Sequence, residues 1–313
     1  MTGDDRRAAA ARIAREVVAG LLPRWRTFWP DTDLEAAADD VAARLADAAR
    51  SWDLQRLVAL DGGNVAVVCA TERRGRPVVT KVHARGHPEE AELRSEAAAL
   101  AFWQPTGAVP ELIDRRDDGL TVLMARVVPG TALDAARVGI DARLTVLGRL
   151  AGRLHTAGAP PDTALPLGTY AAAGRRALAD DRGALAELDE LLAPGPGDVL
   201  IHADLHGGNA LLARDGWKAI DPHAARADPH ADVWALLDPL VPALAGDGPD
   251  AARTARGWVD RYARAAGLDP SRAAAWTRLR ARTTAAGVDA QAEPSPADRS
   301  WAARLRRMAQ ALA

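Results

Sequence analysis

The sequence predicts an α+β fold of two lobes, in which a small antiparallel sheet is followed by a mainly helical part. Three observations support this. Strand-like runs with hairpin signals cluster between residues 54 and 125, Pro129-Gly130 then breaks the chain, and the pattern downstream is mostly helical. We therefore expect residues 1–128 to form an N-terminal lobe that opens with helices in residues 1–52. Residues 129–313 should form the C-terminal lobe.

Two amphipathic helices are predicted ahead of the sheet, at residues 8–21 and 34–52. In the second, apolar residues from Leu34 to Ala48 return every three or four positions, and Asp33 precedes them as a cap. Strands and one further helix follow. The expected strands are 54–60, 65–71, 77–84, a short one near 112 and 120–125, with hairpin turns at 61–64 and 72–76 and a helix from 88–90 to about 103.

The second half is predicted to be helical, with one interruption. Helices are expected at 141–156, capped by Asp141, and at 170–192. Paired strands at 198–201 and 217–220 flank a polar segment. Four pairs of a cap residue and a proline predict later helix starts, at Asp228-Pro229, Gly248-Pro249, Asp269-Pro270 and Ser295-Pro296.

Composition narrows the class of protein. The chain has 313 residues, enough for two lobes, and 48% of them are apolar. A net charge of −2 gives no general attraction to nucleic acid. Cys69 is the only cysteine, so neither an internal disulfide nor a zinc cluster is expected. The N-terminus is polar and no long apolar run is present, so we expect a cytoplasmic protein that does not enter membranes.

The polar segment between the two strands is the most informative feature of the chain. It reads His202-Ala203-Asp204-Leu205-His206-Gly207-Gly208-Asn209, which matches the H-x-D-x-x-x-x-N frame of a kinase catalytic loop. Asp204 is expected to accept or orient the proton of a hydroxyl. Asn209 and Asp221 offer the oxygen ligands that Mg²⁺ prefers. His202 is expected to hydrogen-bond backbone near Asp221. The alternative is a polar surface turn.

The predicted sheet carries matching features for nucleotide phosphates. Lys81 lies in the third strand, and Glu96 follows fifteen positions later in the next helix, where an ion pair would hold the lysine toward phosphate. Gly62 and Gly63 lie in the turn before it, and their N–H groups suit an anion. Taken singly, each residue is equally explained as an exposed charge or as ordinary turn chemistry.

These segments together resemble the aminoglycoside phosphotransferase family, in its streptomycin 6-kinase and hydroxyurea phosphotransferase branch. The resemblance covers roughly residues 50–290 and implies a bilobal protein-kinase-like fold. It rests on the polar segment and on Trp52–Leu54, Arg149–His155, Ala219–Pro222, Asp228–Trp234 and Leu268–Trp276. The sequence departs from many relatives at Gly207, where they carry proline, and Asp221-Pro222 replaces D-F-G, so no activation loop is expected.

The resemblance also implies residue roles. ATP, with GTP not distinguished from it, and Mg²⁺ would be the cofactors. Asp204 would be the catalytic base, Asn209 and Asp221 the metal ligands, and Lys81, braced by Glu96, the phosphate ligand. The backbone of Ala125 and Val127 would contact adenine. Asp232 is either a buried brace for the catalytic loop or a helix cap.

The acceptor that the resemblance implies is a small molecule with a hydroxyl group, foremost a streptomycin-type aminoglycoside, as in an antibiotic-resistance kinase. A sugar, a peptide antibiotic or a biosynthetic intermediate is the alternative, and a nucleotide-binding module without activity is a third. Monomer and homodimer both stay open. The chain offers Asp228, Asp260, Asp289 and Glu293 as acids for a cationic acceptor, and Trp217, Trp234 and Trp276 as stacking or core residues. An acid-lined cleft would favour an aminoglycoside, and a neutral or basic cleft another metabolite.

Overall fold

The computed structural model of the chain describes residues 3–28, 33–60, 66–87, 90–116, 118–169, 171–237, 249–291 and 293–313. Its contacts divide the chain into two compact units, Met1–Gln104 with Pro110–Val127 and Pro105–Val109 with Val128–Ala313. The change between units at 127/128 lies one residue before the expected boundary, and residues 105–109 join the second unit. Within the described ranges, none of the helices combines the length and the apolar character needed to cross a bilayer.

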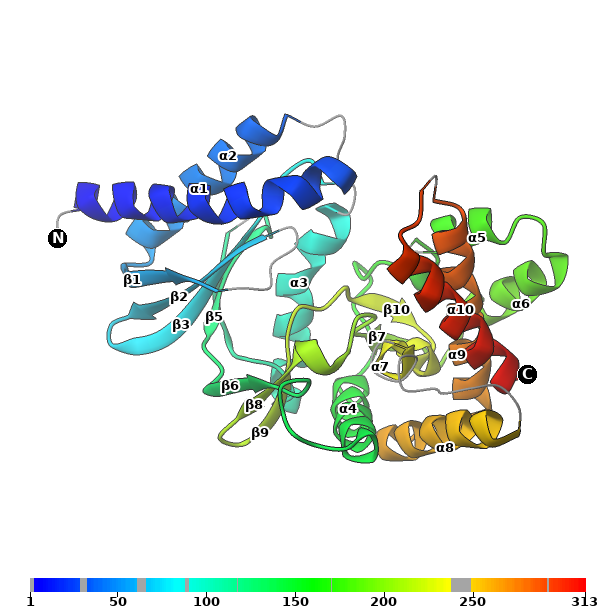
Figure 1. The fold of residues 1–313 in the computed structure, drawn as a ribbon. Helices are drawn as coiled ribbons and strands as arrows, with labels where there is room; N and C mark the ends of the chain where they lie inside the picture. The colour runs from blue at the N-terminus through cyan, green and yellow to red at the C-terminus, as the bar shows by residue number, and fades with distance from the viewer. Residues whose placement is uncertain are drawn as a thin grey trace. The chain divides into compact units, whose positions relative to one another are not determined.

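Five antiparallel strands form the sheet of the first unit, in the order β1-β2-β3-β5-β4 (Figure 1). They are β1 (Leu54–Ala59), β2 (Ala66–Arg73), β3 (Arg76–His83), β4 (Leu112–Arg115) and β5 (Thr121–Ala125). The β2–β3 turn has φ of 52° at Arg74 and 77° at Gly75, as a two-residue hairpin turn requires. The predicted antiparallel sheet is confirmed, with β3 at its centre.

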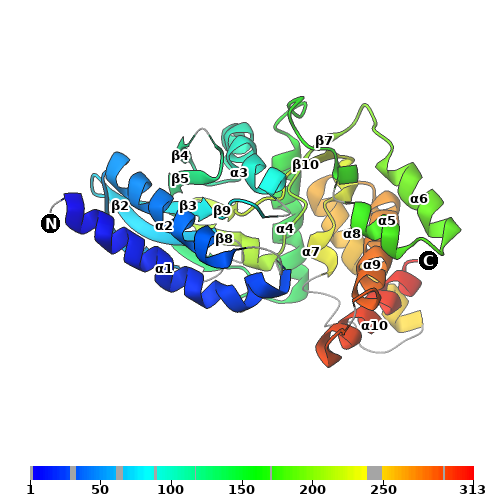
Figure 2. The same ribbon diagram turned by 90° about the horizontal axis from the view of Figure 1, so that it is seen from above.

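Helices α1 (Gly3–Phe28), α2 (Leu34–Ser51) and α3 (Glu90–Trp103) complete this unit. Figures 1 and 2 both show α1 running alongside α2. The predicted apolar stripe of α2 is buried with side chains of the sheet, including Leu45 from the helix and Val78 from β3. Each such burial contributes about 1.5–3 kcal/mol. The predicted cap is confirmed, because the Asp33 carboxylate accepts the N–H groups of Glu35 and Ala36.

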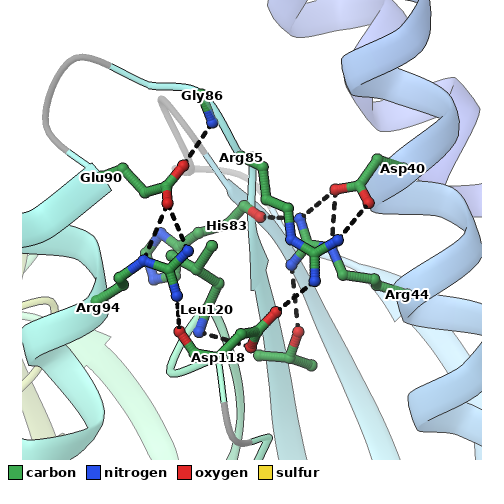
Figure 3. Close-up of polar contacts among 10 residues, drawn as sticks. Asp40, Arg44, His83, Arg85, Gly86, Glu90, Arg94, Asp118 and Leu120 are labelled. Atoms are coloured by element: carbon green, nitrogen blue, oxygen red, sulfur yellow. Dashed lines mark hydrogen bonds and ion pairs between the residues drawn. The ribbon is translucent and has the colours of Figure 1, made fainter.

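A polar network also ties α2 to the sheet (Figure 3). The Arg44 guanidinium donates to Asp40, to the Thr121 hydroxyl and to the carbonyl of His83. Arg85 joins Asp40 to Asp118, with Nη–Oδ distances of 3.0 and 2.8 Å. Burial by itself raises the pKa of Asp118, but the hydrogen bonds from Arg85 and the Leu120 N–H, with the nearby arginine charges, bring it below its usual range. The network thus fastens α2 to the end of β3.

The second unit is mainly helical, with two small sheets. Its helices are α4 (Ile140–His155), α5 (Ala172–Ala177), α6 (Arg182–Leu192), α7 (Trp234–Leu237), α8 (Pro249–Ala266), α9 (Pro270–Asp289) and α10 (Pro296–Ala311). Its strands are β6 (Pro129–Ala132), β7 (Val199–Ile201), β8 (Ala210–Ala213), β9 (Gly216–Ala219) and β10 (Ala225–Ala227). Short 3-10 turns are η1 (Gln104–Thr106), η2 (Leu167–Thr169), η3 (Gly207–Asn209) and η4 (Pro229–Ala231).

Several predicted features of this unit need correction. The helix expected at 170–192 is two helices, because Asp181 accepts the Ala184 N–H and starts α6 anew. Asp141 lies in the first turn of α4, whose N-cap is Gly139. Asp228-Pro229 opens only the turn η4. The strands β7 and β9 exist but do not pair with each other, since β7 pairs with β10 and β9 with β8.

The caps of the last two helices are confirmed. Asp269 accepts the Arg272 N–H at the start of α9, and Ser295 forms a reciprocal capping box with Asp298 at the start of α10. Helix α8 begins at Pro249, and Gly248 lies outside the described residues. Figures 1 and 2 show α9 and α10 side by side.

Helices α4 and α8 approach closely because α4 presents glycines to its neighbour. A Cβ atom at Gly148 would lie 2.5 Å from the Tyr262 carbonyl oxygen, and one at Gly152 would lie 2.8 Å from that of Ala266. The contact fixes Tyr262, whose buried hydroxyl donates to the backbone carbonyl of Asp232. The helix pair therefore helps to hold the segment that leads to α7.

Candidate active site

The first unit buries a lysine against a glutamate. Lys81 on β3 is 6% exposed and Glu96 on α3 is 2% exposed. The Lys81 Nζ lies 3.0 Å from Oε2 and 3.2 Å from Oε1 of Glu96. The ion pair that the spacing predicts is therefore present, and removing one partner would leave a buried charge unpaired, at about 3–5 kcal/mol.

The same carboxylate has a second partner that the sequence analysis did not anticipate. The Nε2 atom of His83 lies 2.6 Å from Oε2 of Glu96, and the His83 side chain is buried. His83 follows Lys81 by two positions, so the two side chains leave β3 on the same face. This two-residue spacing could have been recognised in the sequence. Glu96 is thus held from two sites on β3.

In the second unit, the expected catalytic loop, residues 202–209, begins where β7 ends, and its backbone is strained. Ala203 has φ of 64° and Asp221 has φ of 58°, a region that costs a non-glycine residue about 1–3 kcal/mol. The predicted contact of His202 is present, because its Nε2 lies 3.0 Å from the carbonyl oxygen of Ile220. Burial lowers the pKa of His202, although neighbouring carboxylates oppose this. The His202 imidazole therefore links the two strained positions.

The two polar ends of the segment 204–209 are joined by hydrogen bonds. The Asn209 amide nitrogen donates to the carbonyl oxygen of Asp204 at 2.9 Å and to its Oδ2 at 3.1 Å. His206 Nδ1 accepts the Gly208 N–H, and its Nε2 lies 3.8 Å from the same Oδ2. The arrangement orients the Asp204 carboxylate and turns the amide oxygen of Asn209 away from it.

Asp221 follows the strand that pairs with the end of the signature. Ala210 and Ala219 are direct partners, and the Ile220 N–H donates to the Asn209 carbonyl at 3.0 Å. One amide oxygen and one carboxylate then fit Mg²⁺, which takes few protein ligands and shares the rest with water and phosphate. Among the residues described, no cluster of three His, Cys, Asp or Glu side chains exists that would suit a different metal.

Asp232 makes the contacts that the buried-brace alternative requires. Its carboxylate is fully buried and accepts the N–H groups of His202 at 3.2 Å and Ala203 at 3.0 Å. His155 Nε2 lies 3.3 Å from Oδ2. Burial alone raises the pKa of Asp232, but the His155 hydrogen bond, nearby His charges and the backbone N–H bring it below its usual range. These contacts favour a brace over a helix cap.

The expected nucleotide contacts are placed only in part. Gly62 and Gly63 lie outside the described residues. Ala125 ends β5, and its N–H donates to the Glu111 carbonyl, so this N–H is already engaged within the sheet. Val127 is the last residue of the first unit. Both stay predictions.

Three of the four acids predicted to bind a cationic acceptor have separate polar partners, and the fourth is exposed. Asp228 is held by His230, Arg272 and the Trp276 Nε1, which lies 3.0 Å from Oδ2. Asp260 pairs with Arg264 and Asp289 with Arg306, both on exposed helix surface. Glu293 is exposed. The partners of Asp228, Asp260 and Asp289 thus lie outside residues 202–209 in the described part of the chain.

A family model for aminoglycoside/hydroxyurea antibiotic resistance kinases matches residues 51–292. The chain belongs to this family. Streptomycin 6-kinase from Streptomyces glaucescens is 33% identical over 243 residues, which are 72% of this chain and 76% of the relative. Hydroxyurea phosphotransferase from Kitasatospora aureofaciens is 36% identical over 205 residues, 61% of this chain and little more than half, 56%, of the relative. The chain is thus a small-molecule phosphotransferase that acts on a hydroxyl group. The expected streptomycin 6-kinase and hydroxyurea phosphotransferase branch is confirmed.

Solved structures agree on the fold of this kinase. Choline kinase LicA from Streptococcus pneumoniae has a TM-score of 0.56 at 14% identity, covering 85% of this chain and 96% of its own. An aminoglycoside phosphotransferase, APH(4)-Ia, in complex with ADP and hygromycin B, has a TM-score of 0.51 at 18% identity, covering 84% and 96%. The predicted protein-kinase-like fold is confirmed.

Proposed function

We propose that this kinase transfers the γ-phosphoryl group of ATP to a hydroxyl, with Asp204 as the base. The observation that carries the proposal is the bond from the Asn209 amide to Asp204 Oδ2, which orients the carboxylate and frees the amide oxygen to act with Asp221. Lys81, held by Glu96, is the phosphate ligand from the first unit. Phosphoryl transfer requires both sets of residues to act on one nucleotide.

The chemistry follows from these assignments. The acceptor oxygen attacks the γ-phosphorus in line, the bond to the β,γ-bridging oxygen breaks, ADP leaves, and the hydroxyl proton passes to Asp204. Because Asn209 holds Oδ2, Oδ1 is the oxygen that meets the hydroxyl. When bound by Asn209 and Asp221, Mg²⁺ would neutralise charge on the phosphates. Positioning and electrostatics supply most of the acceleration.

Two acceptor classes have support. A streptomycin-type aminoglycoside, and with it a resistance role, is supported by the 33% identity to streptomycin 6-kinase. Another hydroxylated metabolite is supported by the chemistry of a cavity in the second unit, lined by residues such as Leu279 and Arg280. An ATP-consumption screen of an aminoglycoside panel beside sugars and uncharged alcohols separates the two.

Replacement of the base tests the proposed chemistry directly. Asp204→Ala should lower kcat by about 10²–10⁴-fold, the usual contribution of general base catalysis, with nucleotide affinity nearly unchanged. Asp215→Ala is the matched control, since that carboxylate lies in the following turn and is 70% exposed. Steady-state turnover and calorimetric ATP binding provide the two readouts. Equal loss of both in a folded Asp204→Ala protein would contradict the assigned role.

A further inference from the structure

A cavity of about 360 Å³ lies in the second unit against one face of α9. It has the size of a small-molecule site, for which about 300–1,000 Å³ is usual. Most of its described lining is apolar, including two tryptophans, Trp276 and Trp301. The polar side chains are Arg280, Thr283, Thr284 and Gln291. No Asp or Glu occurs in the described part of this lining.

Two independent observations place the cavity beside the catalytic loop. Leu167 and Ala231 line it, and both pack with Ala203 on the same small core around Ile201. Arg280 also lines it and is close enough to feel the charge of Asp204. Burial lowers the pKa of Arg280, and the Asp204 carboxylate opposes this. The cavity therefore lies near the segment that carries the proposed base.

Several acids on the surrounding elements are engaged elsewhere. Glu187 on α6 pairs with Arg278 and Arg282, and Asp289 on α9 pairs with Arg306. Further pairs join Asp181 to Arg282 and Asp189 to Arg175. A neighbouring cavity of about 80 Å³ contains Asp228, which is already bound by Arg272. None of these carboxylates lines the larger cavity.

This lining disfavours a polycationic acceptor. Each ammonium or guanidinium group that leaves water needs a carboxylate or several carbonyl partners, and an unpaired buried charge costs several kcal/mol. An apolar ring body, in contrast, gains from burial against the tryptophans and leucines, while the threonine hydroxyls and Gln291 satisfy a few polar groups.

Resting on the proposed function, we infer that the acceptor is an uncharged alcohol with an apolar ring body, bound in the cavity of Trp276, Arg280 and Trp301 with its hydroxyl toward Asp204. Streptomycin 6-kinase would then differ from this chain in the acceptor site, not in the reaction.

Phosphoryl transfer from labelled MgATP to two acceptor panels tests the inference on the full-length wild-type protein. One panel holds uncharged aryl, cyclohexyl and polycyclic alcohols; the other holds streptomycin and further aminoglycosides. We expect kcat/KM for the best uncharged alcohol to exceed that for streptomycin by about 100-fold, as the penalty for an unpaired buried charge implies. A higher or equal value for streptomycin overturns the inference, as does a failure of every uncharged alcohol to be phosphorylated.

A charge placed in the cavity provides a second readout. Thr284→Asp should raise kcat/KM for streptomycin about 10-fold and lower it for uncharged alcohols, since a carboxylate then faces the cation. Ser271→Asp adds the same charge to an exposed position of α9 outside the cavity and should change neither value. Equal effects of the two variants would overturn the inference.

A wrong acceptor class and a wrong proposed function give different experimental results. Slow hydrolysis of MgATP without acceptor, and calorimetric binding of MgATP, report on the nucleotide chemistry alone. If both are present and aminoglycosides are the better acceptors, only the inference is wrong. If the folded protein neither binds nor hydrolyses MgATP, the proposed function is wrong, and the inference with it.

Discussion

At the scale of single residues, Asp134 explains why position 207 is glycine. A Cβ atom at Gly207 would lie 1.9 Å from Oδ1 and 2.6 Å from Cγ of Asp134. The Asp134 N–H also points to the Gly207 carbonyl at 3.3 Å. Any side chain at this position must push Asp134 out. The pair therefore fixes the start of η3, between the base and the metal ligand.

Gly207→Ala should lower kcat by about 10–100-fold, because small misplacements of catalytic groups have effects of that order. Asp134→Ala in the same chain should restore most of the loss by removing the clash. Gly257→Ala, at an open position of α8, is the control and should leave kcat unchanged. Steady-state kinetics of the four proteins decides; no recovery in the double variant would contradict the steric explanation.

Asp232 sets the stability of the same loop. In Asp232→Asn the amide group cannot accept both the His202 and Ala203 N–H bonds, so we expect a loss of about 2–5 kcal/mol in the free energy of unfolding. Denaturant unfolding measures this, with Asp250→Asn, whose side chain is 90% exposed, as the control.

The pH dependence of stability follows from the same carboxyl group. The pKa of Asp232 is lowered in the folded state, so its contribution is complete above the unfolded-state value of about 4 and is lost as the pH falls further. The wild type should therefore lose more stability than Asp232→Asn between about pH 4 and pH 2. Parallel curves for the two proteins would show that Asp232 does not titrate in this way.

At the scale of elements, α2 supports the strand that carries Lys81. The Arg44 side chain is 13% exposed and donates to His83, two residues after Lys81. Arg44→Met should reduce the free energy of unfolding by about 2–4 kcal/mol, since buried acceptors lose a charged donor. Arg15→Met removes an exposed pair with Asp39 and should change it by about 0.5 kcal/mol or less. Equal effects in denaturant unfolding would contradict a supporting role for α2.

The elements that sequence reasoning predicted were those with local signals. Asp33, Asp269 and Ser295 mark helix starts by contacts within four residues, so composition and spacing suffice. The pairing of β7 with β10 was missed because it depends on a partner more than twenty residues away, in a strand of three residues. The helix at 170–192 was overextended because the Asp181 cap interrupts a continuous helical pattern.

Within the site, too, contacts between residues close in the sequence could be predicted, and contacts between distant residues could not. The signature from His202 to Asn209 is contiguous, so its frame could be identified before the structure was known. The contacts of Asp134 with Gly207, and of Arg280 with the cavity near Asp204, join residues more than seventy positions apart. No sequence period encodes them. Three of the predicted substrate acids have different arginine partners, and an acid's sequence position does not show which arginine it meets.

At the scale of the whole molecule, the proposed chemistry draws on both units. Lys81 and Glu96 belong to the first, and Asp204, Asn209 and Asp221 to the second. Each unit is stabilised separately, by a sheet covered by α1 and α2 in one and by packed helices in the other. A single nucleotide served by both sets must therefore couple their stabilities, because a ligand stabilises every part it binds.

Hydrogen exchange in the presence of MgATP measures this coupling. Amides of β3 and of β8 should become protected at the same half-saturating concentration of MgATP. At an MgATP concentration of 100 times its Kd, the free energy of opening of both strands should rise by about 2.7 kcal/mol. Lys81→Ala should weaken protection of β8, and Asp221→Asn should weaken protection of β3, because either substitution lowers the affinity for the one nucleotide that stabilises both units. Arg253→Ala, at an exposed position of α8, should alter neither. If Lys81→Ala affected only its own unit, the two sets of residues would serve separate ligands and the proposed phosphoryl transfer would be wrong.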